Sequence, residues 1–422
     1  MKYSINTYRL YQSEKMFSHT VRIHVRMKDE ADRAVLDQAV NTAMKRYPYF
    51  AVRVSLDEEG GYVLLPNDAR VVVLPTGKKL PKLGSKAVNG HLVYADCEGK
   101  DIYLNISHSL CGGKGFQPWV MTTVYEYVKE KYNADPDSPG IRKPDSALLP
   151  TETAEPSMGM LTEEEPVFRR KDGKSPILAA DYLNGLMNPF MRKPNYRVFV
   201  IDQAELIKVA RQNDASVMAL FFIIFARVLD RFFAKKYKTI TGECAHNPRE
   251  SLGLPDTHCD IMSHIHVGFD RDMLDRDLET LGTMTRGQII LQSDPSVSHA
   301  ELRNLYSLYD AADQEHGIKN KRKYIAEHSH STGHGSFVLN YTGQMDWGEV
   351  ADYIDWYAYI IEGHFTIEIT ALADKIIVGF MQLVDTDKYA RAFREELARI
   401  GLSCKEEGPY PKRLPKHDLP QG

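Results

Sequence analysis

A histidine at the end of an apolar run is the residue best suited to chemistry in this sequence. His108 follows the strand-like stretch 101–106 and Ser107, and it precedes the glycine pair Gly112 and Gly113. A histidine at the point where a strand enters a loop is placed to face a cleft. Its imidazole can take and return a proton near neutral pH. The spacing therefore predicts a general base at His108.

The glycines that follow allow two interpretations. Because glycine has no Cβ atom, Gly112 and Gly113 would let a substrate approach the backbone, and a tight turn before the next helix explains them equally well. We expect Ser107, Gly112 and Gly113 to contact substrate. Cys111 has no acid–base partner nearby except His108, so we expect a packed side chain there instead of a nucleophile.

Other histidines form two clusters, at 258–266 and at 328–334. Neither has zinc-finger spacing or an H-E-x-x-H helix, so no metal site is predicted. The sequence also has no G-x-G-x-x-G motif and no P-loop, so these routes to nucleotide phosphate binding are unsupported.

The composition is that of an ordinary globular protein. The 422 residues are 43% hydrophobic and 26% charged, with a net charge of −4, so charge does not point to nucleic acid as a partner. The most apolar run, 217–229, is too short to cross a bilayer, which takes about 20 residues. Five scattered cysteines and a start without an apolar signal core predict a reduced, cytoplasmic protein.

The periodicity predicts two α/β lobes. The first has a strand at 21–25, a helix at 28–46, a hairpin at 51–65, the strand that delivers His108, and a helix at 116–129. Residues 133–176 hold prolines and acidic residues typical of an irregular connection. The second lobe is predicted from a strand at 197–201, helices at 203–212 and 217–233, a strand at 376–380 and a helix at 388–400. The predicted lobes are residues 1–175 and 176–422.

Three segments resemble an acyltransferase superfamily that includes chloramphenicol acetyltransferase, plant BAHD enzymes, alcohol acetyltransferases and condensation domains of peptide synthetases. The His108 segment is similar to the H-x-x-x-D-G signature, "RYPYF" at 46–50 to an R-x-P-x-L turn, and 204–229 to the helix pair of the second lobe. The resemblance is strongest to the condensation-domain and alcohol acetyltransferase branch. It implies two chloramphenicol acetyltransferase-like lobes, each a mixed sheet with helices, and a cleft or tunnel between them.

The resemblance also implies a reaction. His108 would remove a proton from a hydroxyl or amine acceptor, which then attacks a thioester carbonyl. The leading expectation is an acyl-CoA donor, with no permanently bound cofactor. One alternative is a stand-alone condensation-like enzyme that takes an acyl-phosphopantetheine thioester from a carrier protein. The other is a degenerate member that binds a ligand or partner without catalysis.

A second region enters through the same resemblance. The segment Asn340–Gly343 is similar to an N-x-G turn at the cleft, which implies substrate contacts for Asn340, Tyr341 and Gly343. A hairpin turn explains these residues at least as well. The strand at 363–370 is expected to cross between the lobes.

One departure from the signature concerns Gly112, which stands where the family has aspartate. That aspartate pairs with an arginine of the second lobe, and Arg249 is similar to it in position. We therefore expect Arg249 to have a structural role near the site. It would either pair with another acid, such as Glu250 or Asp256, or leave the loop to be held by other means.

Overall fold

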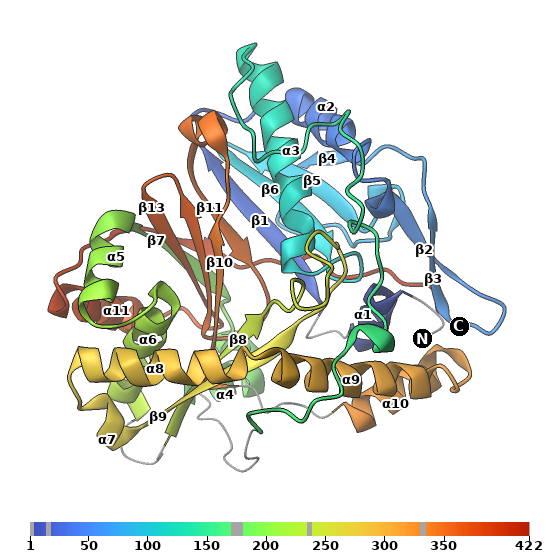
Figure 1. The fold of residues 1–422 in the computed structure, drawn as a ribbon. Helices are drawn as coiled ribbons and strands as arrows, with labels where there is room; N and C mark the ends of the chain where they lie inside the picture. Colours follow the sequence, from blue (N-terminus) through green and yellow to red (C-terminus); the bar gives the residue numbers. More distant parts are fainter. Residues whose placement is uncertain (1–3, 14–17, 170–179, 234–238, 330–334, 422) are drawn as a thin grey trace.

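The structure is a computed structural model that describes residues 4–13, 18–169, 180–233, 239–329 and 335–421. It contains two large mixed sheets, each packed with helices, and a separate two-stranded hairpin (Figure 1). The prediction of two α/β lobes is confirmed.

The first sheet has the strand order β11-β1-β6-β5-β4, in which β11 is Ile354–Ile360 and β4 and β5 run parallel. Helices α2 and α3 pack on it and on each other, with the hairpin β2–β3 beside them (Figure 1). The elements of this lobe are η1 (Ile5–Tyr8), α1 (Arg9–Gln12), β1 (Thr20–Met27), α2 (Arg33–Met44), β2 (Val52–Leu56), β3 (Tyr62–Pro66), β4 (Val73–Pro75), β5 (Val93–Glu98), β6 (Asp101–Ser107) and α3 (Gly113–Tyr132).

The second sheet has the order β14-β7-β13-β12-β10-β8-β9, with β10 parallel to both of its neighbours. Helices α5, α6 and α11 share its apolar core. The elements are α4 (Ala180–Met187), β7 (Asn195–Asp202), α5 (Gln203–Gln212), α6 (Val217–Phe233), β8 (Thr239–His246), β9 (Ser263–Asp270), α7 (Arg271–Leu274), α8 (Leu278–Gln292), α9 (Pro295–Ala312), α10 (Gly317–His328), β10 (Phe337–Gln344), β12 (Thr366–Leu372), β13 (Lys375–Gln382), α11 (Lys388–Arg399) and β14 (Lys405–Pro411).

Local sequence explains where the predicted helices begin. The Asp32 carboxylate accepts hydrogen bonds from Ala34 and Val35, so α2 starts at Arg33, later than the periodicity alone predicts. The Ser216 hydroxyl caps α6 in the same way, by accepting the Ala219 N–H at 3.1 Å. The capping residues thus mark both helix starts.

The polar face of β1 lies at the junction of the lobes, not in solvent. Arg22 is buried and forms an ion pair with Asp96 at 2.6 Å. His24 is fully buried, and its Nδ1 is 2.7 Å from the Tyr196 hydroxyl of β7. Alternation along this strand therefore separates an apolar core from a polar interface between the sheets.

The strand that crosses between the lobes is β11 (Ile354–Ile360), and the prediction that 363–370 crosses is wrong. β11 pairs with β1, with Tyr359 opposite Ile23. β12 pairs instead with β10 and β13 inside the second sheet. Both runs are apolar and buried, so periodicity cannot tell which sheet each of them joins.

The predicted lobe boundary between residues 175 and 176 lies outside the described residues. Strands before that position belong to the first sheet or to the separate hairpin, and strands after it belong to the second sheet. The exception is β11, which pairs in the first sheet. No helix in the described ranges has the length and apolar character needed to span a bilayer.

Candidate functional site

His108 stands one residue beyond the end of β6. Its Nδ1 lies 3.1 Å from the Cys111 carbonyl oxygen, and its backbone N–H donates to the His19 carbonyl at 2.8 Å. A carbonyl can only accept, so Nδ1 carries the hydrogen and Nε2 presents a lone pair. In the described part of the chain no hydrogen bond engages Nε2. This tautomer is the one a general base requires.

Ser107 does not have a free hydroxyl. Its side chain is fully buried, and its Oγ lies 2.7 Å from Ser109 Oγ and 2.7 Å from His417 Nε2. His417 belongs to the C-terminal segment, which returns to the first lobe through a backbone bridge to Leu83. Ser107 therefore connects the start of the His108 loop to the C-terminal segment.

The two glycines of the loop differ in their surroundings. A Cβ atom on Gly113 would meet nothing within 4 Å, so there is open space beside it. A Cβ atom on Gly112 would lie 2.9 Å from Asp260 Oδ1 and 3.4 Å from Arg249 Nη2. The Gly112 N–H also donates to the His258 carbonyl at 3.1 Å. At residue 112 close packing, not backbone strain, demands glycine.

Arg249 is buried beside this loop but does not form the expected ion pair. Its guanidinium donates to the carbonyls of Thr257 at 2.9 Å and Cys259 at 2.5 Å, and to Asn247 Oδ1 at 2.8 Å. Across the described ranges no carboxylate lies within salt-bridge distance of it, and Asp256 pairs with Arg142 instead. Backbone carbonyls accept the hydrogen bonds of the guanidinium, so Arg249 stabilises the loop between β8 and β9, to which it belongs.

A buried acid that the sequence did not reveal lies at the same point. Asp260, in the loop between β8 and β9, forms an ion pair with Arg9 Nε at 2.7 Å. Burial acts to raise the pKa of Asp260, but Arg9, His108 and Arg249 outweigh it and hold that pKa below its usual range. Its backbone N–H donates to Asn6 Oδ1 at 2.7 Å. No local pattern signals these contacts, because they join residues about 250 positions apart.

The turn predicted at Asn340–Gly343 is wrong, because β10 continues through these residues to Gln344. A register shift after Tyr341 and a left-handed φ of 75° at Gly343 mark a bulge. Asn340 Oδ1 accepts the Ala245 N–H at 3.0 Å, and Asn340 Nδ2 donates to Glu368 Oε1 at 2.6 Å. No hydrogen bond or ring contact between described residues links this segment to His108, so its substrate contacts stay a prediction.

Glu368 is a second buried acid in this region. Burial raises the pKa of its carboxyl to about 8, although the hydrogen bond from Asn340 acts in the opposite direction. The side chain points away from the apolar core formed by Ile367 and Ile369. Glu368 is therefore a carboxyl group that is largely protonated at neutral pH.

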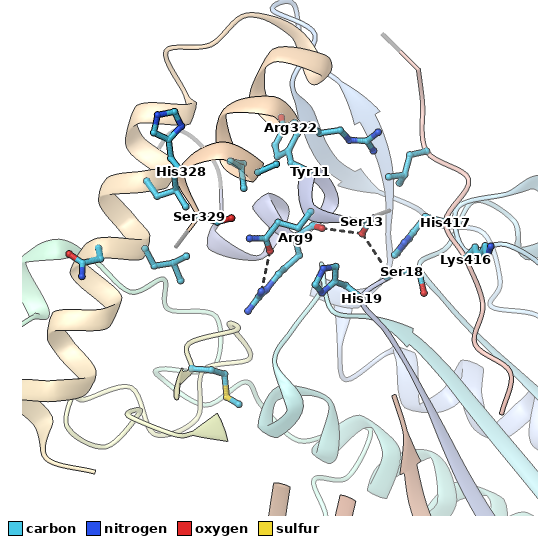
Figure 2. Close-up of a pocket in the computed structure, with 18 of the residues that line it drawn as sticks. Arg9, Tyr11, Ser13, Ser18, His19, Arg322, His328, Ser329, Lys416 and His417 are labelled. Atoms are coloured by element: carbon cyan, nitrogen blue, oxygen red, sulfur yellow. Dashed lines mark hydrogen bonds between the residues drawn. The ribbon is translucent and has the colours of Figure 1, made fainter. Parts of the chain in front are cut away.

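A cavity of about 1120 Å³ lies beside the His108 loop. Its lining comes from the N-terminal helix, the residues just before β1, α9, α10 and the C-terminal segment (Figure 2). His19 and His417, which bond to His108 and Ser107, line it, whereas His108 itself does not. Two lobes thus contribute to the cavity, and a tunnel reaching the His108 imidazole stays a prediction.

The lining carries more positive than negative charge. Glu301 is the acid among the described lining residues. The four cationic residues that line the cavity are Arg9, Lys82, Arg322 and Lys416. Burial lowers the pKa of His19 to about 3 and that of His417 to about 4, so both are neutral at pH 7. Burial also opposes charge on His264, but Glu301 outweighs it and raises the pKa of that histidine.

Arg322 and Lys416 are the cations of this lining that form no ion pair in the described ranges. The Arg322 guanidinium donates to the Tyr62 hydroxyl at 3.1 Å, and its buried Nε has no hydrogen-bond partner. By contrast, Arg9 and Lys82 pair with Asp260 and Asp418. Among the described residues, the cavity therefore offers positive charge without an acidic partner.

The remaining candidates concern metals and thiols. In the described ranges no group of three His, Cys, Asp or Glu side chains is arranged to hold a metal ion. His330 and His334 of the second histidine cluster lie outside those ranges. Cys111 is fully buried, and burial raises its pKa well above the usual value, so it is a packed thiol.

No protein-family model matches the chain, and no curated protein sequence does either. Solved structures do match it over nearly their whole length. TRI101 of F. sporotrichioides, solved with coenzyme A and T-2, has a TM-score of 0.59 at 11% identity, covering 96% of this chain and 99% of that one. The trichothecene 15-O-acetyltransferase TRI3 from Fusarium sporotrichioides has a TM-score of 0.56 at 10% identity, covering 94% and 93%.

A third match is the epimerization domain from the third module of tyrocidine synthetase B. Its TM-score is 0.54 at 12% identity, covering 93% of this chain and 94% of that one. At these identities the likeness establishes the fold alone. The chain therefore has the two-lobed fold of these solved structures, which is the fold that the resemblance in its sequence implies.

Proposed function

We propose that this protein is an acyltransferase that moves an acyl group from a coenzyme A thioester to a hydroxyl or amine acceptor. The observation that carries the proposal is the tautomer of His108. Nδ1–H is held by the Cys111 carbonyl, and Nε2 is left with a lone pair and no partner among the described residues. A neutral imidazole with one nitrogen held by a carbonyl and the other available as an acceptor is the form that a general base needs.

The proposed reaction uses His108 as base and then as acid. Nε2 accepts the proton of the acceptor hydroxyl or amine while the acceptor oxygen or nitrogen attacks the thioester carbonyl. The tetrahedral adduct collapses with cleavage of the carbon–sulfur bond, and Nε2–H returns the proton to the leaving thiolate. The Cys111 carbonyl keeps the ring oriented through both steps.

The start of α3 supports the same proposal. Gly112 precedes the first helical residue, and no side chain caps the N–H groups of this turn. Open space lies beside Gly113. Uncapped N–H groups favour negative charge, so the developing oxyanion of the adduct has suitable donors near His108.

The charge of the cavity supports coenzyme A as donor. Coenzyme A carries several phosphate charges, and Arg322 and Lys416 offer cations without acidic partners in the described ranges. We propose that its phosphate-bearing end lies at this wall, with the acyl end directed past His19 toward His108. No permanently bound cofactor is part of this proposal.

A carrier protein is the second candidate donor. The resemblance of the sequence to condensation domains, which implies a thioester carried by coenzyme A or by a carrier protein, favours it, and the fold is also that of the tyrocidine synthetase B epimerization domain. A phosphopantetheine arm would follow the same route to His108 but would not bring the adenosine phosphates of coenzyme A. The proposal includes a small-molecule acceptor and a cytoplasmic location, and it includes no nucleic acid.

A screen of acyl transfer and thioester hydrolysis with short and long acyl-CoAs tests the function. The wild type should turn over at least one acyl-CoA, and His108→Ala should not. Equal slow rates for the two proteins across all donors, with acyl-CoA still bound, would support the non-catalytic alternative. Transfer from an acylated carrier protein but not from acyl-CoA would support the second donor.

A further inference from the structure

The loop that holds His108 is closed by groups from two distant parts of the chain. Asn6 Nδ2 donates to the Leu110 carbonyl at 2.8 Å, and Asn6 Oδ1 accepts the Asp260 N–H at 2.7 Å. The Gly112 N–H reaches the His258 carbonyl. The N-terminal segment and the loop before β9 therefore hold the His108 loop from two sides.

The Asp260 carboxylate fills the space beside Gly112. A side chain on residue 112 would begin 2.9 Å from Asp260 Oδ1 and 3.1 Å from its Cα atom. Cβ atoms in proteins essentially never approach another atom as closely as 2.9 Å, and the 3.1 Å to the Asp260 Cα atom is also tighter than most real Cβ contacts. An aspartate at position 112 would direct its own carboxylate into the volume that Asp260 occupies.

Asp260 also carries the charge closest to the loop. Its Oδ2 accepts a hydrogen bond from Arg9 Nε at 2.7 Å, and the residue is 6% exposed. A buried carboxylate is retained at such a point only when it is paired and hydrogen-bonded. Arg9, His108 and Arg249 together hold the pKa of Asp260 below its usual range against the effect of burial.

From this geometry we propose that Asp260 is the positioning residue for His108, with its carboxylate in the space that a side chain at residue 112 would take. Asn6 joins the Asp260 N–H to the Leu110 carbonyl, and Asp260 itself packs against Gly112. The Cys111 carbonyl that orients the imidazole lies between these two contacts in the chain. Any effect of Asp260 on catalysis rests on the proposed function. The geometric role of Asp260 holds without it.

The proposal predicts that the buried volume between residues 112 and 260 holds one carboxylate, which either residue can supply. Gly112→Asp alone would place two carboxylates in one buried volume, so it should destabilise the protein and not restore a lost contact. Asp260→Asn keeps the size but removes the charge. Gly112→Asp combined with Asp260→Gly returns one carboxylate to the volume, supplied from the first lobe instead of the second.

The experiment compares these three variants with the wild type and with Asp256→Asn. Asp256 is a matched control, because it is an acid of the same loop that pairs with Arg142. Thermal unfolding, kcat and KM for acyl transfer, and the ¹⁵N NMR signals of His108 would be measured. The NMR signals report which ring nitrogen carries the hydrogen, whether or not the protein turns over.

We expect Asp260→Asn to mix the His108 tautomers and to lower kcat by up to about 10²-fold, with little change in KM. Gly112→Asp should lower the unfolding temperature, and the double variant should recover most of the stability and a single tautomer. Tautomers unchanged in Asp260→Asn, or a double variant no better than Gly112→Asp, would overturn the proposal. An inactive wild type with the expected NMR and stability results would instead count against the proposed function only.

Discussion

The His108 loop and the Asn340 segment are both candidate substrate contacts, but they differ in how their polar atoms are used. At His108 one ring nitrogen is held by a carbonyl, and the other has no partner in the described ranges. At Asn340 the side-chain amide bridges two strands, accepting from Ala245 and donating to Glu368. The first side chain keeps an atom available for a reaction, whereas the second is committed to holding the sheet.

This difference shows which information identifies a functional side chain. Residue type and sequence spacing select both segments. Only the hydrogen-bond partners separate a group with unused capacity from one that is saturated. The predictions below test whether the two regions are as different as their contacts indicate.

The largest expected effect is at His108. His108→Ala should lower kcat/KM for acyl transfer by about 10²–10⁴-fold, which is roughly 3–5 kcal/mol of barrier, because the base is lost. Steady-state kinetics measure it, with thermal unfolding to check the fold. His316→Ala, at an exposed histidine before α10, is the matched control and should leave the rate unchanged.

Asn340→Ala should act on stability instead. It leaves the Ala245 N–H and the Glu368 carboxyl without their partner, so we expect the free energy of unfolding to fall by about 1–3 kcal/mol. Denaturant unfolding measures this, and kcat should change little. A raised KM with unchanged stability would mean that Asn340 does contact substrate, and the contrast between the two regions would fail.

Glu368 sharpens the comparison through pH. Its pKa of about 8 in the folded protein exceeds the ordinary value, so the folded state keeps a proton that the unfolded chain releases as pH rises. Stability should fall between about pH 5 and pH 8, by up to about 1.4 kcal/mol per pH unit. Glu368→Gln mimics the protonated acid and should remove that part of the slope in unfolding measured across this range. An identical slope in both proteins would refute the assignment.

The smallest expected effect is at the cavity wall. Arg322→Gln should weaken binding of coenzyme A by about 10-fold or less, because one partly exposed charge contributes about 1 kcal/mol. Calorimetry at low and high salt would measure it. Pantetheine, which lacks the phosphates, should bind both proteins equally. Arg286→Gln, at a surface arginine paired with Asp214, is the control.

Sequence predicts most of the architecture because the signals for it are local. The caps at Asp32 and Ser216 and the apolar run of α6 are all readable within one turn or one element. His108 is also found locally, from a strand that ends in a glycine-containing loop. What the sequence does not reveal depends on chain segments that meet only after folding.

Three features of the site are of this second kind. Asp260 supplies a charge beside Gly112, but nothing near either residue marks the other. Arg249 is satisfied by carbonyls, which every residue possesses and no pattern can distinguish. Gly343 lies at a bulge and not at a turn, because the segment continues to pair with β12 beyond it.

The placement of β11 has a consequence for synthesis of the protein. β1 pairs on one side with β6, which follows closely in sequence, and on the other with β11, which begins at Ile354. A ribosome adding roughly 5–20 residues per second therefore leaves one edge of the nascent first sheet open for tens of seconds. Since unpaired apolar edges recruit other chains, this interval is the most aggregation-prone stage we expect in the life of the molecule, and a chaperone would be most useful then.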